Sequence, residues 1–205
     1  MVEEFKIVFW DFDGVIKESV SVKSLGYANL FSLFGKEVVD QINEHHEANG
    51  GVSRFEKIRF YHETFLNKVV TNDEIKELAD RFSKLVVKKV IDSPYVPGVL
   101  DFIKKLNNKY KIYISTGTPT FEIKMIIRGR GISEYFSKVY GSPEKKDDHI
   151  NKIINEYRFK PEELLFFGDS NSDLEAASSS GLHFILRRHT INKKHFLYYR
   201  GKAIK

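Results

Sequence analysis

The sequence predicts an α/β fold, in which a Rossmann-like parallel sheet core carries an inserted α-helical cap domain. Short apolar runs that end at turn or polar residues alternate with stretches of helical spacing, which is typical of a parallel sheet covered by helices on both faces. Residues 15–91 differ, because they have helical spacing and no convincing strand. We therefore expect a core domain built from residues 1–14 and 92–205, and a cap domain built from residues 15–91.

The expected sheet comes from five apolar runs that are too short for helices. In chain order they are residues 6–10, 111–115, 138–140, 164–167 and 182–186, of which 138–140 is the weakest. Between them, apolar residues recur at helical spacing in four places, which are 99–106, 119–127, 150–157 and 174–178. Each expected strand after the first is therefore followed or preceded by a helix that can cover the sheet.

The expected cap contains signals for the beginning and end of helices. Thr71 and Glu74 have the spacing of a capping box, and an amphipathic pattern follows them from residues 75 to 86. Apolar spacing from residues 22 to 34 predicts an earlier helix, and the run at residues 49–51, Asn-Gly-Gly, separates helices. The cap is thus expected to be helical throughout.

Composition excludes several classes of protein. The 205 residues are 41% hydrophobic and 30% charged, as in globular domains, and the absence of cysteine excludes disulfides, thiolate metal sites and a Cys nucleophile. No run approaches the ~20 apolar residues that span a bilayer, and the N-terminus does not resemble a signal peptide, so we expect a cytoplasmic protein with no membrane partner. The net charge of +5 indicates a basic surface or attraction of anionic substrates. Basic residues between 187 and 205 leave nucleic-acid binding as a distant alternative, although no recognised motif accompanies them.

Pairs of carboxylates follow two of the expected strands. Asp11 and Asp13 end the first strand beside Gly14, and Asp169 and Asp173 follow residues 164–167. Carboxyl ends of parallel strands share one edge, where ligands bind, and crowded carboxylates there suit Mg²⁺. Each pair also has a plainer explanation, a strand-to-turn junction at the first and a capped helix at the second.

Residues suited to phosphate binding follow two other strands. Thr116 and Gly117 offer a hydroxyl and free backbone N–H groups, and Lys146 can neutralise a phosphoryl group. Ser115 is an alternative to Thr116, and Lys145 is an alternative to Lys146. An ordinary helix cap and a surface lysine would explain the same residues without function.

The order of these motifs resembles the haloacid dehalogenase superfamily along nearly the whole chain. The motifs are DFDG at residues 11–14, Thr116 after a strand, Lys146 after a loop, and GDSNSD at residues 168–173. The helical insert directly after DFDGV resembles the C1 cap of that superfamily. Members that cleave carbon–halogen bonds lack the second Asp of DxD, so Asp13 favours phosphoryl chemistry.

The resemblance implies roles for the reacting groups. Asp11 would be the nucleophile that becomes an aspartyl-phosphate, and Asp13 would be the general acid and base. Thr116, Gly117 and Lys146 would bind the phosphoryl oxygens. These roles agree with the chemistry, because a carboxylate cannot approach a phosphate dianion unless positive charge offsets their repulsion.

The resemblance also implies a metal and a substrate class. Mg²⁺ would be held by Asp11, the backbone carbonyl of Asp13 and Asp169, with Asp173 supporting. The expected reaction is Mg²⁺-dependent hydrolysis of a phosphate monoester of a small metabolite, and the alternative is a phosphomutase of the β-phosphoglucomutase type. Arg54 lies where C1 caps often carry a specificity loop, so it is either a substrate-binding residue or an ordinary surface arginine. The sequence does not specify the substrate or the oligomeric state.

Overall fold

The computed structural model describes residues 5–204, so residues 1–4 and 205, at the two ends of the predicted core domain, lie outside the described part. Its sheet has six parallel strands in the order β3-β2-β1-β4-β5-β6. The strands are β1 (Ile7–Trp10), β2 (Lys111–Pro119), β3 (Lys138–Ser142), β4 (Leu164–Gly168), β5 (His183–Arg187) and β6 (Ala203–Ile204). The predicted α/β fold class is confirmed.

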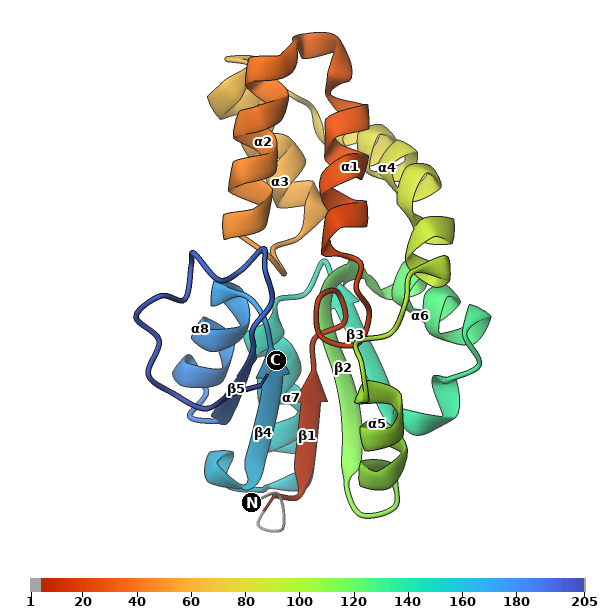
Figure 1. Cartoon of the computed structure of the whole chain (residues 1–205), viewed down its shortest axis with the longest axis vertical. Coiled ribbons are helices and arrows are strands. Elements are labelled where there is room, and N and C mark those ends of the chain that lie inside the picture. Colours follow the sequence, from red (N-terminus) through yellow and green to blue (C-terminus); the bar gives the residue numbers. More distant parts are fainter. Residues whose placement is uncertain (1–4, 205) are drawn as a thin grey trace.

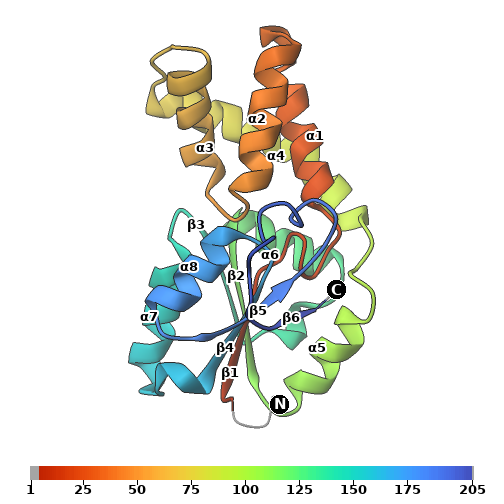
Figure 2. The ribbon, with the colours of Figure 1, turned by 60° about the vertical axis from the view of Figure 1, so that its left-hand side comes forward.

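Both faces of the sheet are covered by helices, as Figure 2 shows from one edge. Successive side chains of a strand point to opposite faces, so Val8 and Trp10 of β1 join one apolar cluster while Ile7 and Phe9 join the other. The first cluster includes residues of α5 (Val99–Asn107) and α6 (Thr120–Gly129), and the second includes residues of α7 (Lys146–Tyr157) and α8 (Asn171–Ser179). Burial on both faces explains why β1 and β4 read as unbroken apolar runs.

Two strands, β2 and β6, depart from the sequence prediction. β2 was expected to end at Ser115, but it continues to Pro119, where it pairs with Ser142 of β3 after an irregularity in register. Pro119 is consequently the residue that precedes α6 rather than a member of its first turn. β6 was not predicted, because its two residues are too few to show a pattern.

The four α-helices between β1 and α5 lie over the carboxyl ends of the strands, at the top of Figure 1. They are α1 (Val20–Leu30), α2 (Lys36–Ala48), α3 (Arg54–Phe60) and α4 (Asn72–Asp92). The capping box of α4 is confirmed, since the Thr71 hydroxyl accepts from the Glu74 N–H and the Glu74 carboxylate accepts from the Thr71 N–H. The prediction of a single helix over residues 22–34 was wrong at its C-terminal end. α1 stops at Leu30, and a short 3-10 turn leads to Gly35, whose φ of 89° cannot continue a helix. The division into two domains stays a prediction.

The two connections between these helices and the sheet are joined by one buried lysine. The ammonium group of Lys17 donates to the carbonyls of Ile91 and Ser93, and it lies 4.4 Å from the centre of the Tyr95 ring. This contact fixes the two crossing segments to each other beneath α1 and α4. None of the helices within residues 5–204 is long and apolar enough to cross a membrane.

Candidate active site

Three carboxylates meet where β1 and β4 end. One oxygen from each of Asp11, Asp169 and Asp173 lies within 4.8 Å of the others, and all three residues are buried. The sheet register explains this, because Trp10 pairs with Phe167 and the residues after them emerge side by side. Gly14 contributes as well, since a Cβ there would lie 2.1 Å from an Asp169 oxygen. The structure therefore brings these predicted site residues together, while their roles stay predictions.

This cluster is electrostatically suited to a cation. Burial raises the pKa of Asp11 well above its usual value, which Lys146 opposes and the neighbouring acids reinforce. Burial and the charge of Asp173 raise the pKa of Asp169 in the same way. In addition, Oδ1 of Asp11 accepts no well-aligned hydrogen bond within residues 5–204, although Nζ of Lys146 lies 3.1 Å away. Buried carboxylate oxygens gathered in this way are hard donors that fit a divalent metal ion.

Lys146 lies between two of the acids. Its Nζ is 3.1 Å from Oδ1 of Asp11, and it donates a hydrogen bond to Asp173. Burial alone would lower the pKa of Lys146, but the charges of Asp11 and Asp173 outweigh burial and raise it, so the side chain stays charged. Lys145 is exposed at the start of α7. Of the two candidate lysines, the geometry favours Lys146.

Ser115 and Thr116 point to opposite faces of β2. The hydroxyl of Ser115 lies 2.9 Å from Nδ1 of His149, within the α7 side of the sheet. Thr116 instead lines the cavity that also contains Asp11 and Asp13. The strand's alternation therefore favours Thr116 as the residue that faces a ligand.

Asp173 holds the other residues in place. Its Oδ2 accepts from the backbone N–H groups of Asp169 (3.1 Å) and Ser170 (3.0 Å) and from the Ser170 hydroxyl (2.6 Å), which also caps α8. Its Oδ1 accepts from Lys146. The carboxylate is thus occupied by contacts that position its neighbours, and its supporting role at a metal stays a prediction.

Asp13 has surroundings different from those of the three-acid cluster. Its carboxylate accepts from the hydroxyls of Ser19 (2.6 Å) and Thr118 (3.1 Å), and Nζ of Lys23 is 3.0 Å away. Burial would raise the pKa of Asp13, but Lys23 and these hydrogen bonds outweigh it and lower the pKa. Lys23 and Thr118 were not predicted, because nothing in the sequence indicates that α1 turns a lysine toward the residue ten positions before it.

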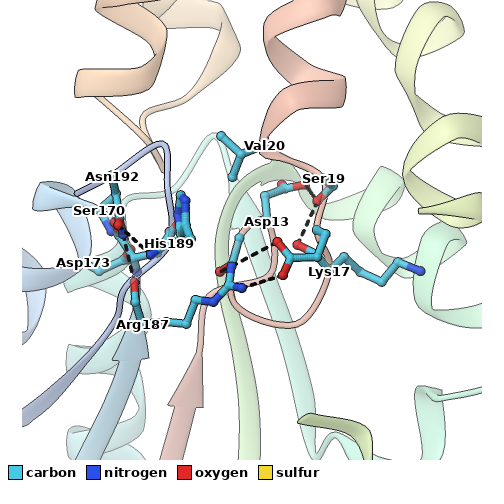
Figure 3. A network of polar contacts seen from close by, with 12 residues as sticks. Asp13, Lys17, Ser19, Val20, Ser170, Asp173, Arg187, His189 and Asn192 are labelled. Atoms are coloured by element: carbon cyan, nitrogen blue, oxygen red, sulfur yellow. Dashed lines mark hydrogen bonds and ion pairs between the residues drawn. The ribbon is translucent and has the colours of Figure 1, made fainter. Parts of the chain in front are cut away.

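The segment after β5 also supplies residues that the sequence analysis missed (Figure 3). Nε2 of His189 is 2.7 Å from Oδ2 of Asp169, and the Asn192 amide donates to the Asp169 carbonyl at 2.8 Å. Arg187 donates to the Gly14 carbonyl at 2.9 Å and forms an ion pair with Glu18. The nucleic-acid alternative rested on the basic residues between 187 and 205. Some of them are therefore already occupied by contacts around the acidic cluster.

The loop that precedes α3 contacts the edge of the sheet at which the strands end. The Ser172 hydroxyl donates to the Gly50 carbonyl at 2.8 Å, and a Cβ on Gly117 would lie 2.2 Å from the Gly51 carbonyl oxygen. Beneath this contact lies a cavity of about 70 Å³. Its lining combines core residues with side chains of the cap, among them Asp11, Asp13, Thr116, Lys23, Arg54 and Lys57. The cavity thus lies between the helical segment that precedes α5 and the carboxyl ends of the strands.

Arg54 is not the surface arginine that the sequence left open, because only 3% of it is exposed. Both terminal nitrogens bind the Glu122 carboxylate, at 2.8 and 2.6 Å, and one also donates to Ser83. Its guanidinium is consequently compensated by an acid of α6, 68 positions away. Substrate binding by Arg54 stays a prediction, and the charge of Arg54 is already paired with Glu122.

A buried lysine beside Asp11, next to three clustered carboxylates, is the combination of charges that an α/β enzyme of phosphoryl transfer would need. Residues 8–187 match the sequence model of the haloacid dehalogenase-like hydrolase family, and the chain belongs to this family. The predicted resemblance is confirmed.

Named relatives support a phosphatase. Phosphoglycolate phosphatase of Haemophilus influenzae is 24% identical over 189 residues, covering 88% of this chain and 84% of the relative. Phosphorylated carbohydrates phosphatase of Thermotoga maritima is 27% identical over 191 residues, covering 87% and 82%. The crystal structure of β-phosphoglucomutase from Clostridium difficile has a TM-score of 0.77 at 17% identity, covers 98% of this chain and 91% of its own, and shows a shared fold. The protein is a phosphatase of the haloacid dehalogenase-like family.

Proposed function

We propose that the protein hydrolyses a phosphate monoester of a small metabolite in a Mg²⁺-dependent reaction that passes through an aspartyl-phosphate on Asp11. The observation that carries this proposal is the pairing of a buried Asp11 with Lys146, in which Asp11 also lines the cavity shared with residues of α1, α3 and the loop before α3. The relatives named for phosphoglycolate and carbohydrate phosphates support a small phosphorylated substrate.

Asp11 and Asp13 divide the chemistry. In the first half, an oxygen of Asp11 attacks phosphorus, the bond from phosphorus to the ester oxygen breaks, and Asp13 gives that oxygen a proton. In the second half, water attacks phosphorus and Asp13 takes a proton from that water. The bond from phosphorus to the Asp11 oxygen then breaks, inorganic phosphate leaves, and Asp11 is restored as a carboxylate. The lowered pKa of Asp13 suits the second half, because it keeps a carboxylate available as base.

The other residues bind and neutralise. Lys146, the Thr116 hydroxyl and the backbone N–H of Gly117 would hold the phosphoryl oxygens. Asp11, the Asp13 carbonyl and Asp169, supported by Asp173, would hold Mg²⁺. When bound, Mg²⁺ supplies the positive charge that offsets repulsion between the Asp11 carboxylate and the phosphoryl group.

The experiment measures phosphate release from phosphoglycolate and hexose phosphates, with Mg²⁺ or with excess chelator. The wild-type protein should release phosphate only with Mg²⁺, and Asp11→Asn, purified in parallel, should lower the rate by at least about 10³-fold. An Asp11→Asn protein that keeps a tenth of the wild-type rate would refute the nucleophile. Isomerisation of a hexose phosphate without free phosphate would identify the mutase instead.

A further inference from the structure

The cap contains a buried lysine that has no acidic partner within residues 5–204. Lys57, on α3, is 2% exposed and lines the cavity that contains Asp11 and Asp13. Its Nζ lies 2.9 Å from Nδ1 of His46 and 3.4 Å from the His46 carbonyl. Burying an ammonium group without a carboxylate costs free energy, so such a lysine needs an explanation.

His46 does not supply the missing negative charge. Burial lowers its pKa well below the usual value, and the charge of Lys57 lowers it further, so the imidazole is neutral. With Nδ1 accepting from Lys57, the ring proton lies on Nε2, which has no hydrogen-bond partner in the described part of the chain. The pair therefore offers hydrogen-bond donors and lacks an acceptor.

The other cations of the cavity wall are already compensated. Lys23 lies 3.0 Å from an Asp13 oxygen, and Arg54 is bound to Glu122. Among the lysines and arginines that line this cavity in residues 5–204, Lys57 alone has no carboxylate partner. An anion that enters the cavity would gain most from Lys57.

The electrostatics of Lys57 agree with this reading. Burial lowers the pKa of Lys57 to about 7. The nearby charges of Lys23 and Lys146 act in the same direction, and the charge of Asp13 opposes them without restoring the usual value. A bound anion would remove this penalty by pairing with the ammonium group. Strongly perturbed groups in a cleft are frequent at functional sites, for this reason.

We propose that Lys57, with His46 beside it, binds a carboxylate of the substrate, so that the preferred substrates are phosphate monoesters with a carboxylate close to the phosphoryl group. The position of the phosphoryl group at Asp11 rests on the proposed function. A carboxylate suits the site because it is a compact anion that accepts hydrogen bonds, and the cavity that Lys57 and His46 line has a volume of only about 70 Å³.

The test uses two esters of nearly equal size, phosphoglycolate, which carries a carboxylate, and 2-hydroxyethyl phosphate, which carries a hydroxyl. Lys57→Met keeps the apolar stem and removes the charge. We expect kcat/KM for phosphoglycolate to fall about 10- to 100-fold and kcat/KM for hydroxyethyl phosphate to change less than about threefold, as the loss of one charged hydrogen bond predicts. Lys84→Met, the same substitution at an exposed position of α4, should change neither value.

Two further measurements separate loss of carboxylate binding from loss of folding or of turnover. Melting temperature shows whether Lys57→Met is folded, and it should not fall, because an uncompensated buried charge is removed. Calorimetric binding of both esters to Asp11→Asn, with and without Lys57→Met, does not depend on turnover, so it tests Lys57 even if Asp11 is not the nucleophile. Equal losses for both esters, or no loss for either, would overturn the proposal.

Discussion

Ser115 and Thr116, which are neighbours on β2, have different surroundings. Ser115 is committed to His149, whereas Thr116 faces the cavity. We expect Thr116→Ala to lower kcat/KM for phosphate release about 10- to 100-fold, since one hydrogen bond to a charged oxygen is lost. Ser115→Ala should leave kcat/KM within about twofold and lower the free energy of unfolding by about 1 kcal/mol, which urea denaturation measures. The reverse pattern would assign phosphate binding to Ser115.

At the residue scale, the sequence predicted which residue types meet but not which of two neighbours faces the site. Ser115 and Thr116 lie on opposite faces of β2, and Lys145 and Lys146 are the N-cap residue and the first residue of α7. In both pairs the packing of the element against its neighbours decides which side chain reaches the site. Arg54 shows a second limit. Its partner Glu122 belongs to a helix far along the chain, and a single sequence gives no sign of that pairing.

At the scale of elements, two glycines allow the cap loop to sit on the catalytic edge. Gly117 has no room for a side chain, because a Cβ there would lie 2.2 Å from the backbone oxygen of Gly51. Backbone yields less easily than a flexible side chain, so an added methyl group should displace the loop that carries α3. We expect Gly117→Ala to raise KM at least about tenfold, measured by phosphate release.

Gly129→Ala is the matched control, because a Cβ there meets only Ile91, at 3.4 Å. It should leave KM unchanged and raise the free energy of unfolding by about 0.5 kcal/mol, since alanine loses less backbone entropy than glycine in a helix. A Gly117→Ala protein with the wild-type KM would mean that the loop adapts without affecting the substrate.

Elements were predictable where their pattern was long enough to be seen. The five expected strands all occur, because burial on both sheet faces gives unbroken apolar runs, and the capping box located the start of α4. The extension of β2 beyond Ser115 depends on pairing with β3, and β6 depends on pairing with β5. Such tertiary pairings leave no local signature.

At the scale of the whole molecule, the contacts that join the helical insert to the sheet could not be predicted from the sequence. Lys17 links both connections, and Arg187 ties the segment after β5 to the segment before α1. Each contact joins residues more than 70 positions apart. The motif order predicted that these segments belong to one site, and only the folded chain shows which side chains hold them together.

Stability against acid is the last property that the buried side chains predict. His149 is fully buried, with Nδ1 beside the Ser115 hydroxyl and Nε2 3.8 Å from Glu144. Burial lowers its pKa to about 4, with Glu144 opposing and the nearby lysines adding to the effect. In the unfolded chain this histidine binds a proton near pH 6.5, whereas in the folded protein it stays neutral until about pH 4. The contribution of neutral His149 to the free energy of unfolding is therefore fully present above pH 6.5 and is lost as the pH falls toward 4. Between pH 6.5 and 5.0 it amounts to about 2 kcal/mol.

Urea denaturation at pH 7.5, 6.0 and 5.0 measures this loss directly. The free energy of unfolding of the wild-type protein should fall as the pH is lowered, and His149→Gln should flatten that slope because the substituted side chain does not titrate. His183→Gln, at an exposed position of β5, should keep the wild-type slope. Burial also lowers the pKa of His46 and that of His189, the latter to about 4, so some slope should persist in His149→Gln. An unchanged slope in His149→Gln would show that acid instability arises elsewhere, and His46 and His189 would be the next residues to replace.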